Sequence, residues 1–359
     1  MRTYETVARL FVVVLALALS GPALAANVFS TATDAYQAGV RAIEARQFPD
    51  AFQALEWAAG REQEDDAFYA KFALAQLYSS DALPFVDHAK AYALYSDLAT
   101  RYRQVDPFTD LRAPYVARAF VAVALYKAEG LPEIGLKSDA DGAVAALDYA
   151  SQYFDDMDAQ LELVKLWLKD ANDPSKTRQA RDLLVKLARE KGHPGAQATL
   201  AEMFFSGDQK LGRRPALALG FATLAAEGAY ADDQLWIDSV YHRLYCETAP
   251  AAREKAGKIA DKFRKDRRIV EAIREARRKT AIGKITEQAT ESWGNALIWT
   301  CANGEKVRWP ERAGERTPQI EALTASTLPS GSDGAAIISR DDEMGAGLKM
   351  FRPAGESSE

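Results

Sequence analysis

The chain has 359 residues, 48% of them hydrophobic and 10% aromatic, which is enough for one large domain or two ordinary domains with an apolar core. Its formal net charge of −6 at pH 7 argues against a dedicated nucleic-acid binder. Beyond the N-terminal region, no stretch approaches the ~20 apolar residues that cross a bilayer as a helix, which argues against a polytopic membrane protein.

The first residues have the organisation of a secretory signal peptide. Arg2 and Arg9 form a positive start, Leu10–Leu19 is an apolar run, and Ala23–Ala25 supplies a small-x-small cleavage pattern. An uncleaved anchor is the alternative, but this run is about half as long as a bilayer span. We therefore expect cleavage after Ala25, no stable membrane insertion afterwards, and an exported protein. A periplasmic address is favoured over full secretion, although the signal alone does not separate the two.

Alanine-rich helical segments dominate up to about residue 280, and from about 34 to 228 they recur as pairs. Each pair has an aromatic residue near the end of its first helix and an alanine near the end of its second, at intervals of roughly 40 residues. One pair cannot bury its apolar face alone, so neighbouring pairs stack. The pattern predicts an all-α fold, an α-solenoid. The expected helices are 34–46, 50–59, 66–79, 87–102, 114–129, 139–154, 158–170, 175–191, 194–205, 215–227, 231–246 and 251–264.

Local signals support several helix starts and a core register. Side chains that can accept orphan N–H groups at helix starts are Asp87, Asp139, Asp158 and Ser175. Prolines suited to a first turn are Pro194 and Pro215. Small residues let helices approach closely, and large ones fill the space between layers. The expected core residues are Ala75, Ala99, Ala150, Ala188, Ala201, Ala225, Tyr78, Tyr95, Trp167, Leu184 and Phe204.

One junction in the chain resembles a known repeat. Lys191–Ala196 reads KGHPGA and is followed by Leu200-Ala201, Phe204 and Gly207, which is similar to the Sel1-like repeat, a relative of the tetratricopeptide repeat. The likeness is good over 158–228 and loose over 34–155, where the units are longer. It implies a solenoid that binds other proteins.

The overall layout is similar to that of ExoR-type regulators of exopolysaccharide production. The shared features are a signal peptide, a tetratricopeptide-like first hairpin, a long insertion in the middle unit, the KGHPGA junction and a closing helix with Trp236. The resemblance covers residues 34–265. It implies a periplasmic protein that binds the sensing domain of a membrane sensor histidine kinase and holds it off, as in two-component regulation.

The sequence contains few patterns that indicate a catalytic, metal or cofactor site. His88 and His193 lie at a helix start and in a repeat turn, where we expect structural roles. His242 and Cys246 are four residues apart on an expected helix, but no second pair completes four metal ligands. Nucleophile elbows, phosphate-binding glycine loops and zinc-protease motifs are missing from the sequence. We predict no catalytic, metal or cofactor site and do not expect an enzyme.

Cys246 and Cys301 are the two cysteines of the chain. An oxidising compartment favours a disulfide between them. Such a bond would tie the segment after the solenoid to its last helices. The alternative is one thiol buried in the core and one free thiol.

The segment from 253 to 279 is strongly basic, with twelve Lys and Arg residues against five acids. It either contacts an acidic partner or forms a solvated helical face that pairs with its own acids. The candidate partner-binding residues are Lys262, Arg264, Lys265, Arg267 and Arg268. Further on, 296–300 and 306–309 flank an Asn-Gly pair, which predicts a small β-hairpin. From about residue 311 the composition predicts disorder.

We therefore expect a signal peptide (1–25), a solenoid (26–265), a basic helix with a small hairpin (266–310) and a disordered tail (311–359). The expected function is that of a periplasmic protein-binding regulator that restrains a membrane sensor kinase controlling exopolysaccharide and envelope functions. Two alternatives are open. One is a structural or scaffolding envelope protein that binds cell-wall polymer or a polysaccharide assembly machine. The other is an accessory factor to an enzyme, or an enzyme itself. The oligomeric state is not indicated.

Overall fold

The computed structural model describes residues 29–81, 83–169, 173–207, 211–229, 233–264 and 300–310. The predicted cleavage site at Ala25, the basic candidates Lys265, Arg267 and Arg268, and the predicted tail 311–359 lie outside these residues. The described chain is built from α-helices, as its repeating pattern predicts. Within the described ranges, no helix combines the length and the apolar character that crossing a bilayer requires.

The helices lie within a few residues of the predicted positions. In chain order they are α2 Ala32–Glu44, α3 Phe48–Ala59, α4 Asp66–Tyr78, α5 His88–Arg101, α6 Ala113–Glu129, the 3₁₀ turn η1 Pro132–Ile134, α7 Ala140–Tyr153, α8 Met157–Lys169, α9 Pro174–Lys186, the π-helical turn η2 Leu187–Lys191, α10 Pro194–Ser206, α11 Pro215–Gly228, α12 Gln234–Glu247 and α13 Pro250–Phe263.

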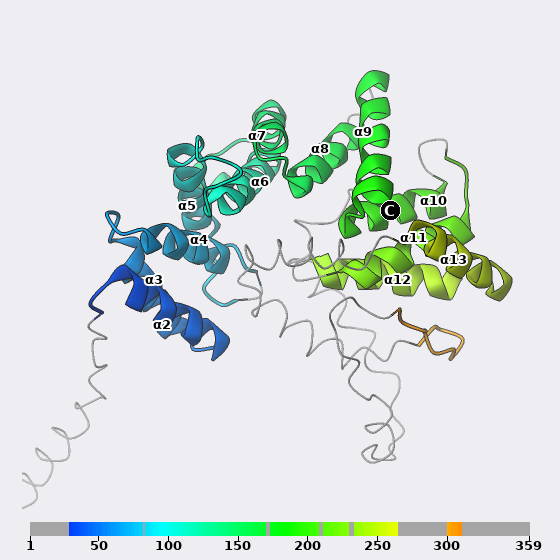
Figure 1. The fold of residues 1–359 in the computed structure, drawn as a ribbon, viewed down its shortest axis with the longest axis horizontal. Coiled ribbons are helices and arrows are strands. Elements are labelled where there is room, and N and C mark those ends of the chain that lie inside the picture. Colours follow the sequence, from blue (N-terminus) through cyan, green and yellow to red (C-terminus); the bar gives the residue numbers. More distant parts are fainter. Residues whose placement is uncertain are drawn as a thin grey trace, which may run out of the picture.

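The helices pack in series. Consecutive helices contact each other along the chain, and each pair rests on the next. Figure 1 shows the stack bending into an arch, with α4, α6 and α8 on its inner side and α5, α7 and α9 on its outer side. Near the C-terminal end of the solenoid the packing closes up, since α11 contacts α10, α12 and α13. This arrangement confirms the predicted α-solenoid.

Three apolar clusters follow one another along the arch. The N-terminal cluster extends from Ala32 to Leu131, the middle cluster from Val121 to Leu163, and the C-terminal cluster from Leu161 to Val307. The predicted seam alanines are all at most 3% exposed, and Tyr78, Tyr95 and Leu184 are also buried. Trp167 and Phe204 are half-buried and pack against the C-terminal cluster, and Trp167 also packs against the middle cluster, as expected for residues that fill the space between layers.

Two of the predicted N-caps are present. The Asp87 side chain accepts the N–H of Lys90, and the Asp139 side chain accepts the N–H of Gly142. Pro194 and the second predicted first-turn proline each begin a helix, as their fixed φ and missing N–H favour.

The other two predicted N-caps are wrong. Asp156, not Asp158, caps α8, because its Oδ1 accepts the N–H of Ala159 at 2.7 Å. Asp173, not Ser175, caps α9, and the Ser175 N–H donates to it at 2.9 Å. Asp158 is thereby available for contacts with other helices.

Residues 296–299 of the predicted C-terminal hairpin lie outside the described residues, and its described part forms an antiparallel bridge between Thr300 and Lys306. The Cys301 N–H donates to the Glu305 carbonyl at 2.8 Å, and the Gly304 N–H donates to the Cys301 carbonyl at 2.8 Å. Gly304 has a φ of +83°. The turn is therefore a three-residue loop, 302–304, with glycine at its end.

Two helical glycines test how closely the helices pack. A Cβ at Gly39 in α2 would lie 2.6 Å from Cγ of Leu55 in α3, whereas a Cβ at Gly257 in α13 would meet nothing within 4 Å. Gly39→Ala should therefore lower the free energy of unfolding by about 1–3 kcal/mol. Gly257→Ala should raise it by about 0.5–1 kcal/mol, because alanine favours the helix. Urea unfolding followed by circular dichroism measures both. Equal stability of the two variants would contradict the close packing of α2 on α3.

Candidate functional site

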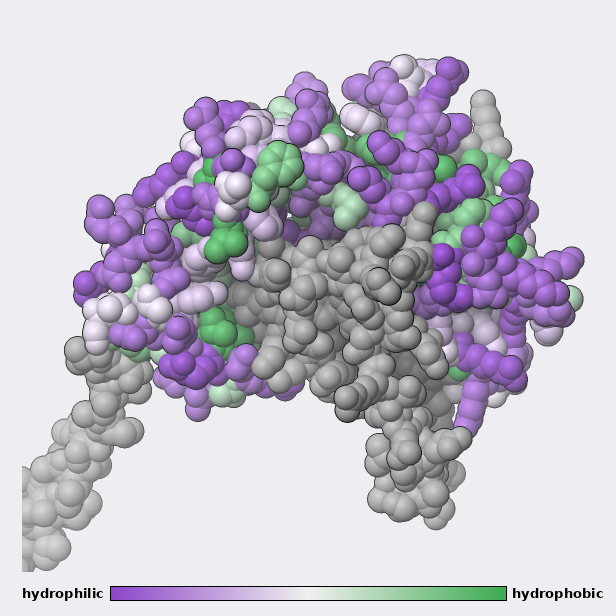
Figure 2. Space-filling view, in the orientation of Figure 1, coloured by the Kyte–Doolittle hydropathy of each residue, from purple (hydrophilic) through white to green (hydrophobic). Residues whose placement is uncertain are grey.

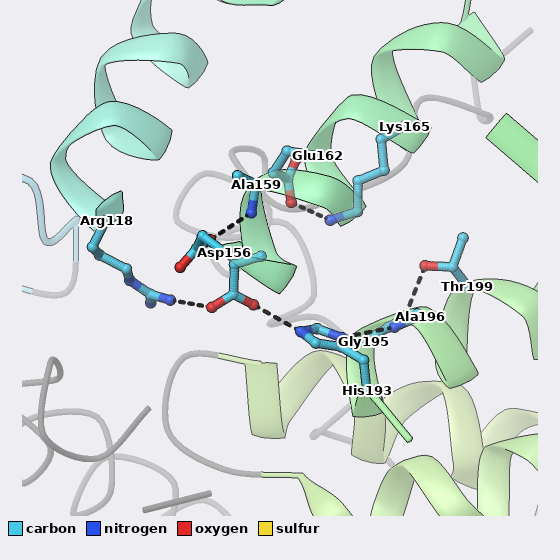
Figure 3. A network of polar contacts seen from close by, with 10 residues as sticks. Arg118, Asp156, Ala159, Glu162, Lys165, His193, Gly195, Ala196 and Thr199 are labelled. Atoms are coloured by element: carbon cyan, nitrogen blue, oxygen red, sulfur yellow. Dashed lines mark hydrogen bonds and ion pairs between the residues drawn. The ribbon is translucent and has the colours of Figure 1, made fainter. Parts of the chain in front are cut away.

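A polar junction links three helix pairs of the solenoid (Figure 3). An Nη1–H of Arg118 in α6 donates to Oδ2 of Asp158 in α8 at 2.8 Å, and Nε2 of His193 lies 3.0 Å from Oδ1 of the same carboxylate. His193 is the N-cap of α10, and its Nδ1 accepts the N–H of Ala196 at 3.2 Å. In the neutral imidazole, Nε2 therefore carries the hydrogen and donates a hydrogen bond to Asp158. One carboxylate thus holds α6 and α10 to α8.

Further charges of α8 lie beside this junction. Burial, together with the neighbouring Asp158, raises the pKa of Asp156 to about 6. Lys165 donates to Glu162 at 2.6 Å, and its Nζ lies 5.5 Å from the ring centre of Trp236 in α12. Burial by itself would lower the pKa of Lys165, but Glu162 outweighs it and raises that pKa. The charges are paired with each other, which suits a role in positioning helices.

The surface feature best suited to binding is the α5–α6 loop, residues 102–112. Phe108 and Leu111 in this loop are 95% and 80% exposed. Figure 2 shows small, separate apolar patches on a largely hydrophilic face. The strongly exposed large hydrophobic residues of the described ranges all lie between 85 and 153, in the second and third helix pairs. Besides these two, they are Phe85, Val86, Ile134 and Tyr153.

Internal hydrogen bonds give the α5–α6 loop a defined shape. The Asp106 carboxylate accepts the N–H groups of Phe108 at 2.8 Å and Thr109 at 3.1 Å. Asp110 accepts the backbone N–H of Arg112 at 2.8 Å and two bonds from its guanidinium group. These bonds favour the charged carboxylates and hold the pKa values of both aspartates below their usual value. Asp106 and Asp110 therefore stabilise the backbone conformation of the loop.

Helix α7 supports the same loop from one side. The Tyr149 hydroxyl donates to the carbonyl of Arg103 at 2.6 Å, and the Tyr153 hydroxyl donates to the carbonyl of Gln104 at 3.4 Å. The two tyrosine rings stack with their centres 5.3 Å apart, and the Arg103 guanidinium lies 4.5 Å from the Tyr149 ring centre. A loop that is ordered before binding loses little conformational entropy when it docks.

Phe108 and Leu111 are not among the binding residues that the sequence predicts. The available signal is the string DPFTDL, in which Asp106 and Asp110 flank an aromatic residue within a connector between two helices. Aspartates in this setting form turns by accepting nearby backbone N–H groups, which pushes the residues between them outward.

The histidines with expected structural roles make contacts that fit them. Nδ1 of His88 lies 2.9 Å from the Tyr126 hydroxyl, and its Nε2 lies 3.0 Å from Oδ1 of Asp81. Nε2 of His242 lies 3.7 Å from Sγ of Cys246. Among the described residues, no group of three or more His, Cys, Asp or Glu side chains could hold a metal ion.

The predicted cysteine pair and two of the basic candidates lie in the described part of the chain. The structure joins Cys246 at the end of α12 to Cys301. Arg264 forms ion pairs with Glu227 and Asp261, which raise its pKa. Lys262 Nζ lies 5.8 Å from the ring centre of the adjacent phenylalanine. Arg264 thus pairs with acids of its own chain, which is the second of the two interpretations given for the basic segment.

Replacing Asp156 by Asn tests the electrostatics of the junction. The folded state raises the pKa of Asp156 from 3.8 to about 6, so it binds more protons than the unfolded state between these two pH values. The stability that Asp156 contributes therefore falls as the pH rises from about 4 to about 6. Asp156→Asn keeps an oxygen for the Ala159 N–H but cannot ionise. The variant should gain stability relative to the wild type across this window.

Urea unfolding at pH 4, 5, 6 and 7 measures this difference, and Asp87→Asn is the matched control. The backbone N–H of Lys90 lowers the pKa of Asp87, which is also an N-cap, so its charged form stabilises the folded state. Asp87→Asn should therefore be less stable than the wild type above about pH 4, with the difference shrinking at lower pH. A constant difference between Asp156→Asn and the wild type from pH 4 to 7 would contradict the raised pKa.

Comparison with curated proteins finds two that are similar to more than half of this chain. An exopolysaccharide production negative regulator of Rhizobium leguminosarum bv. viciae is 25% identical over 250 residues, which cover 68% of this chain and 89% of that protein. The protein of the same name from Rhizobium meliloti (strain 1021) is 23% identical over 210 residues, which cover 58% of this chain and 74% of that protein. No protein-family model matches the chain. The predicted resemblance to ExoR-type regulators is thereby confirmed.

Proposed function

We propose that this protein is a periplasmic negative regulator of exopolysaccharide production, which binds the sensing domain of a membrane sensor histidine kinase and restrains it. The observation that carries the binding role is the α5–α6 loop, which displays Phe108 and Leu111 to solvent on an ordered backbone. The names of the two similar proteins support the regulatory role. Solenoids also commonly bind partners along an extended surface.

Phe108 and Leu111 have the properties of interface anchors. Burying a side chain such as phenylalanine against a partner contributes about 1.5–3 kcal/mol. The hydrogen bonds from Asp106 and the support of Tyr149 reduce the entropy that binding must overcome. The remaining exposed apolar residues of the second and third helix pairs would add contacts around these anchors. The basic segment that includes Lys262 would contribute to the association rate more than to the lifetime of the complex.

A photo-crosslinking experiment in intact cells tests the partner. A photoreactive phenylalanine analogue replaces Phe108 in one strain and Lys258, an exposed residue of α13, in a second strain. Mass spectrometry should recover the sensing domain of a membrane histidine kinase from position 108 and not from position 258. Recovery of cell-wall polymer or a polysaccharide assembly protein at position 108 would instead support the scaffold alternative.

Point variants test the anchors in a deletion strain. Phe108→Ser and Leu111→Ser should each weaken binding by about tenfold or more, which corresponds to roughly 1.4 kcal/mol or more, and should raise exopolysaccharide output. Gln104→Ala in the same loop changes an exposed side chain, keeps the backbone carbonyl that Tyr153 contacts, and is the matched control that should behave like the wild type. Asp106→Ala keeps both anchors but loosens the loop, so an intermediate effect is expected.

Melting temperatures of these variants show whether the fold is intact, because Phe108 and Leu111 are exposed and need not stabilise it. If exopolysaccharide output is the same with and without the protein, and no sensing domain is recovered from position 108, the proposed function is wrong.

A further inference from the structure

The segment 300–310 covers the end of the solenoid. Cys301 and Val307 are 6% and 8% exposed and belong to the C-terminal cluster, against which Trp309 also packs. The last unit of a helix stack has no neighbour to cover its apolar face, so it needs a cap. Segment 300–310 supplies cover for α12, although it lies far from that helix in the sequence.

The described contacts of this segment reach α12 and α13. The Tyr241 hydroxyl donates to the carbonyl of Arg308, and the ring centres of Tyr241 and Trp309 lie 4.9 Å apart. Arg253 in α13 forms an ion pair with Glu305, whose side chain is 40% exposed. A partly exposed ion pair contributes little stability. The Cys246–Cys301 disulfide, which spans 55 residues, adds a covalent restraint to these contacts and to the apolar packing.

The two sulfurs differ in access, and one has a basic neighbour. Cys246 is half-buried, whereas Cys301 is 6% exposed, so an attacking thiolate reaches Cys246 more easily. Nε2 of His242, one turn earlier on α12, lies 3.7 Å from Sγ of Cys246. A nearby imidazolium stabilises a thiolate and lowers the pKa of the thiol.

We propose that Cys246–Cys301 is a thiol–disulfide exchange site for a protein dithiol, and that its reduction releases the segment 300–310 from α12. A thiolate of the dithiol attacks Sγ of Cys246, the protein disulfide breaks, and Cys301 leaves as a thiolate that takes up a proton. The second thiolate of the dithiol then attacks the mixed disulfide and releases the Cys246 thiolate beside His242. The dithiol ends as a disulfide, and two electrons have passed to the protein.

Release of the segment would uncover the apolar face of α12 that Val307 and Trp309 now contact. The change would stay local, because α12 and α13 also pack on α11. Among the described residues, the N-terminal cluster shares no member with the C-terminal cluster. Exchange would thus change one surface of the protein without unfolding the solenoid.

Limited trypsin digestion of the mature chain tests the release, with dithiothreitol as the dithiol. Mass spectrometry follows cleavage after Lys306 and Arg308, with cleavage after Lys71 in α4 as the internal reference. Non-reducing mass mapping first establishes the Cys246–Cys301 link. Reduction should speed cleavage after Lys306 and Arg308 at least tenfold and leave cleavage after Lys71 unchanged. Equal cleavage rates in the oxidised and reduced protein would overturn the proposal.

Two sets of variants distinguish the effect of the Cys246–Cys301 disulfide from the effect of His242. The Cys246→Ser/Cys301→Ser protein should be cleaved after Lys306 at the fast rate with or without dithiothreitol. If it does not fold, the reduced wild type supplies the same comparison. In a Cys301→Ser background, the pH dependence of alkylation by iodoacetamide should give Cys246 a pKa below the usual 8.5, and His242→Gln should raise it. An unchanged alkylation profile in His242→Gln would exclude a role for His242.

Discussion

The arch depends on one carboxylate that serves two helices at once. Asp158 accepts from Arg118 of α6 and from the nearly buried His193 at the start of α10. The apolar clusters on either side are also bridged by Trp167 of α8, so the joint combines apolar packing with this polar contact. Removing Asp158 would take this carboxylate away from Arg118 and leave Nε2 of the nearly buried His193 without its acceptor, which is why such joints tolerate little change.

Much of the fold follows from local sequence, because each helix pair is a local unit. Alanines such as Ala150 and Ala225 mark the seams, and Asp87 and Asp139 mark helix starts. Asp158 shows where local reasoning stops. Asp156 and Asp158 both stand at the start of α8, and spacing alone cannot show which one caps the helix. The choice is made by Arg118 and by a histidine 35 residues away in the chain, which only the packed structure brings together.

The candidate binding surface was harder to predict than the fold. Hydrophobic periodicity assigns apolar residues to the core, and Trp167 fits that assignment by packing between two apolar clusters. Hydrophobic periodicity does not identify Phe108, an apolar residue that a turn holds in solvent. The basic segment is a candidate binding site because of its composition, yet Arg264 forms ion pairs with Glu227 and Asp261. Charge counts do not reveal such internal pairing, whereas the contacts of each side chain do.

The polar joint also constrains how this chain can change over evolutionary time. Most helix pairs contact only their neighbours, so a pair can be duplicated or lost wherever the seam residues match. The junction of Arg118, Asp158 and His193 draws its members from three successive pairs, so no single pair can be cut out there without breaking it. The order of these three helix pairs is therefore fixed, whereas the helix pairs on either side can change in length and in sequence.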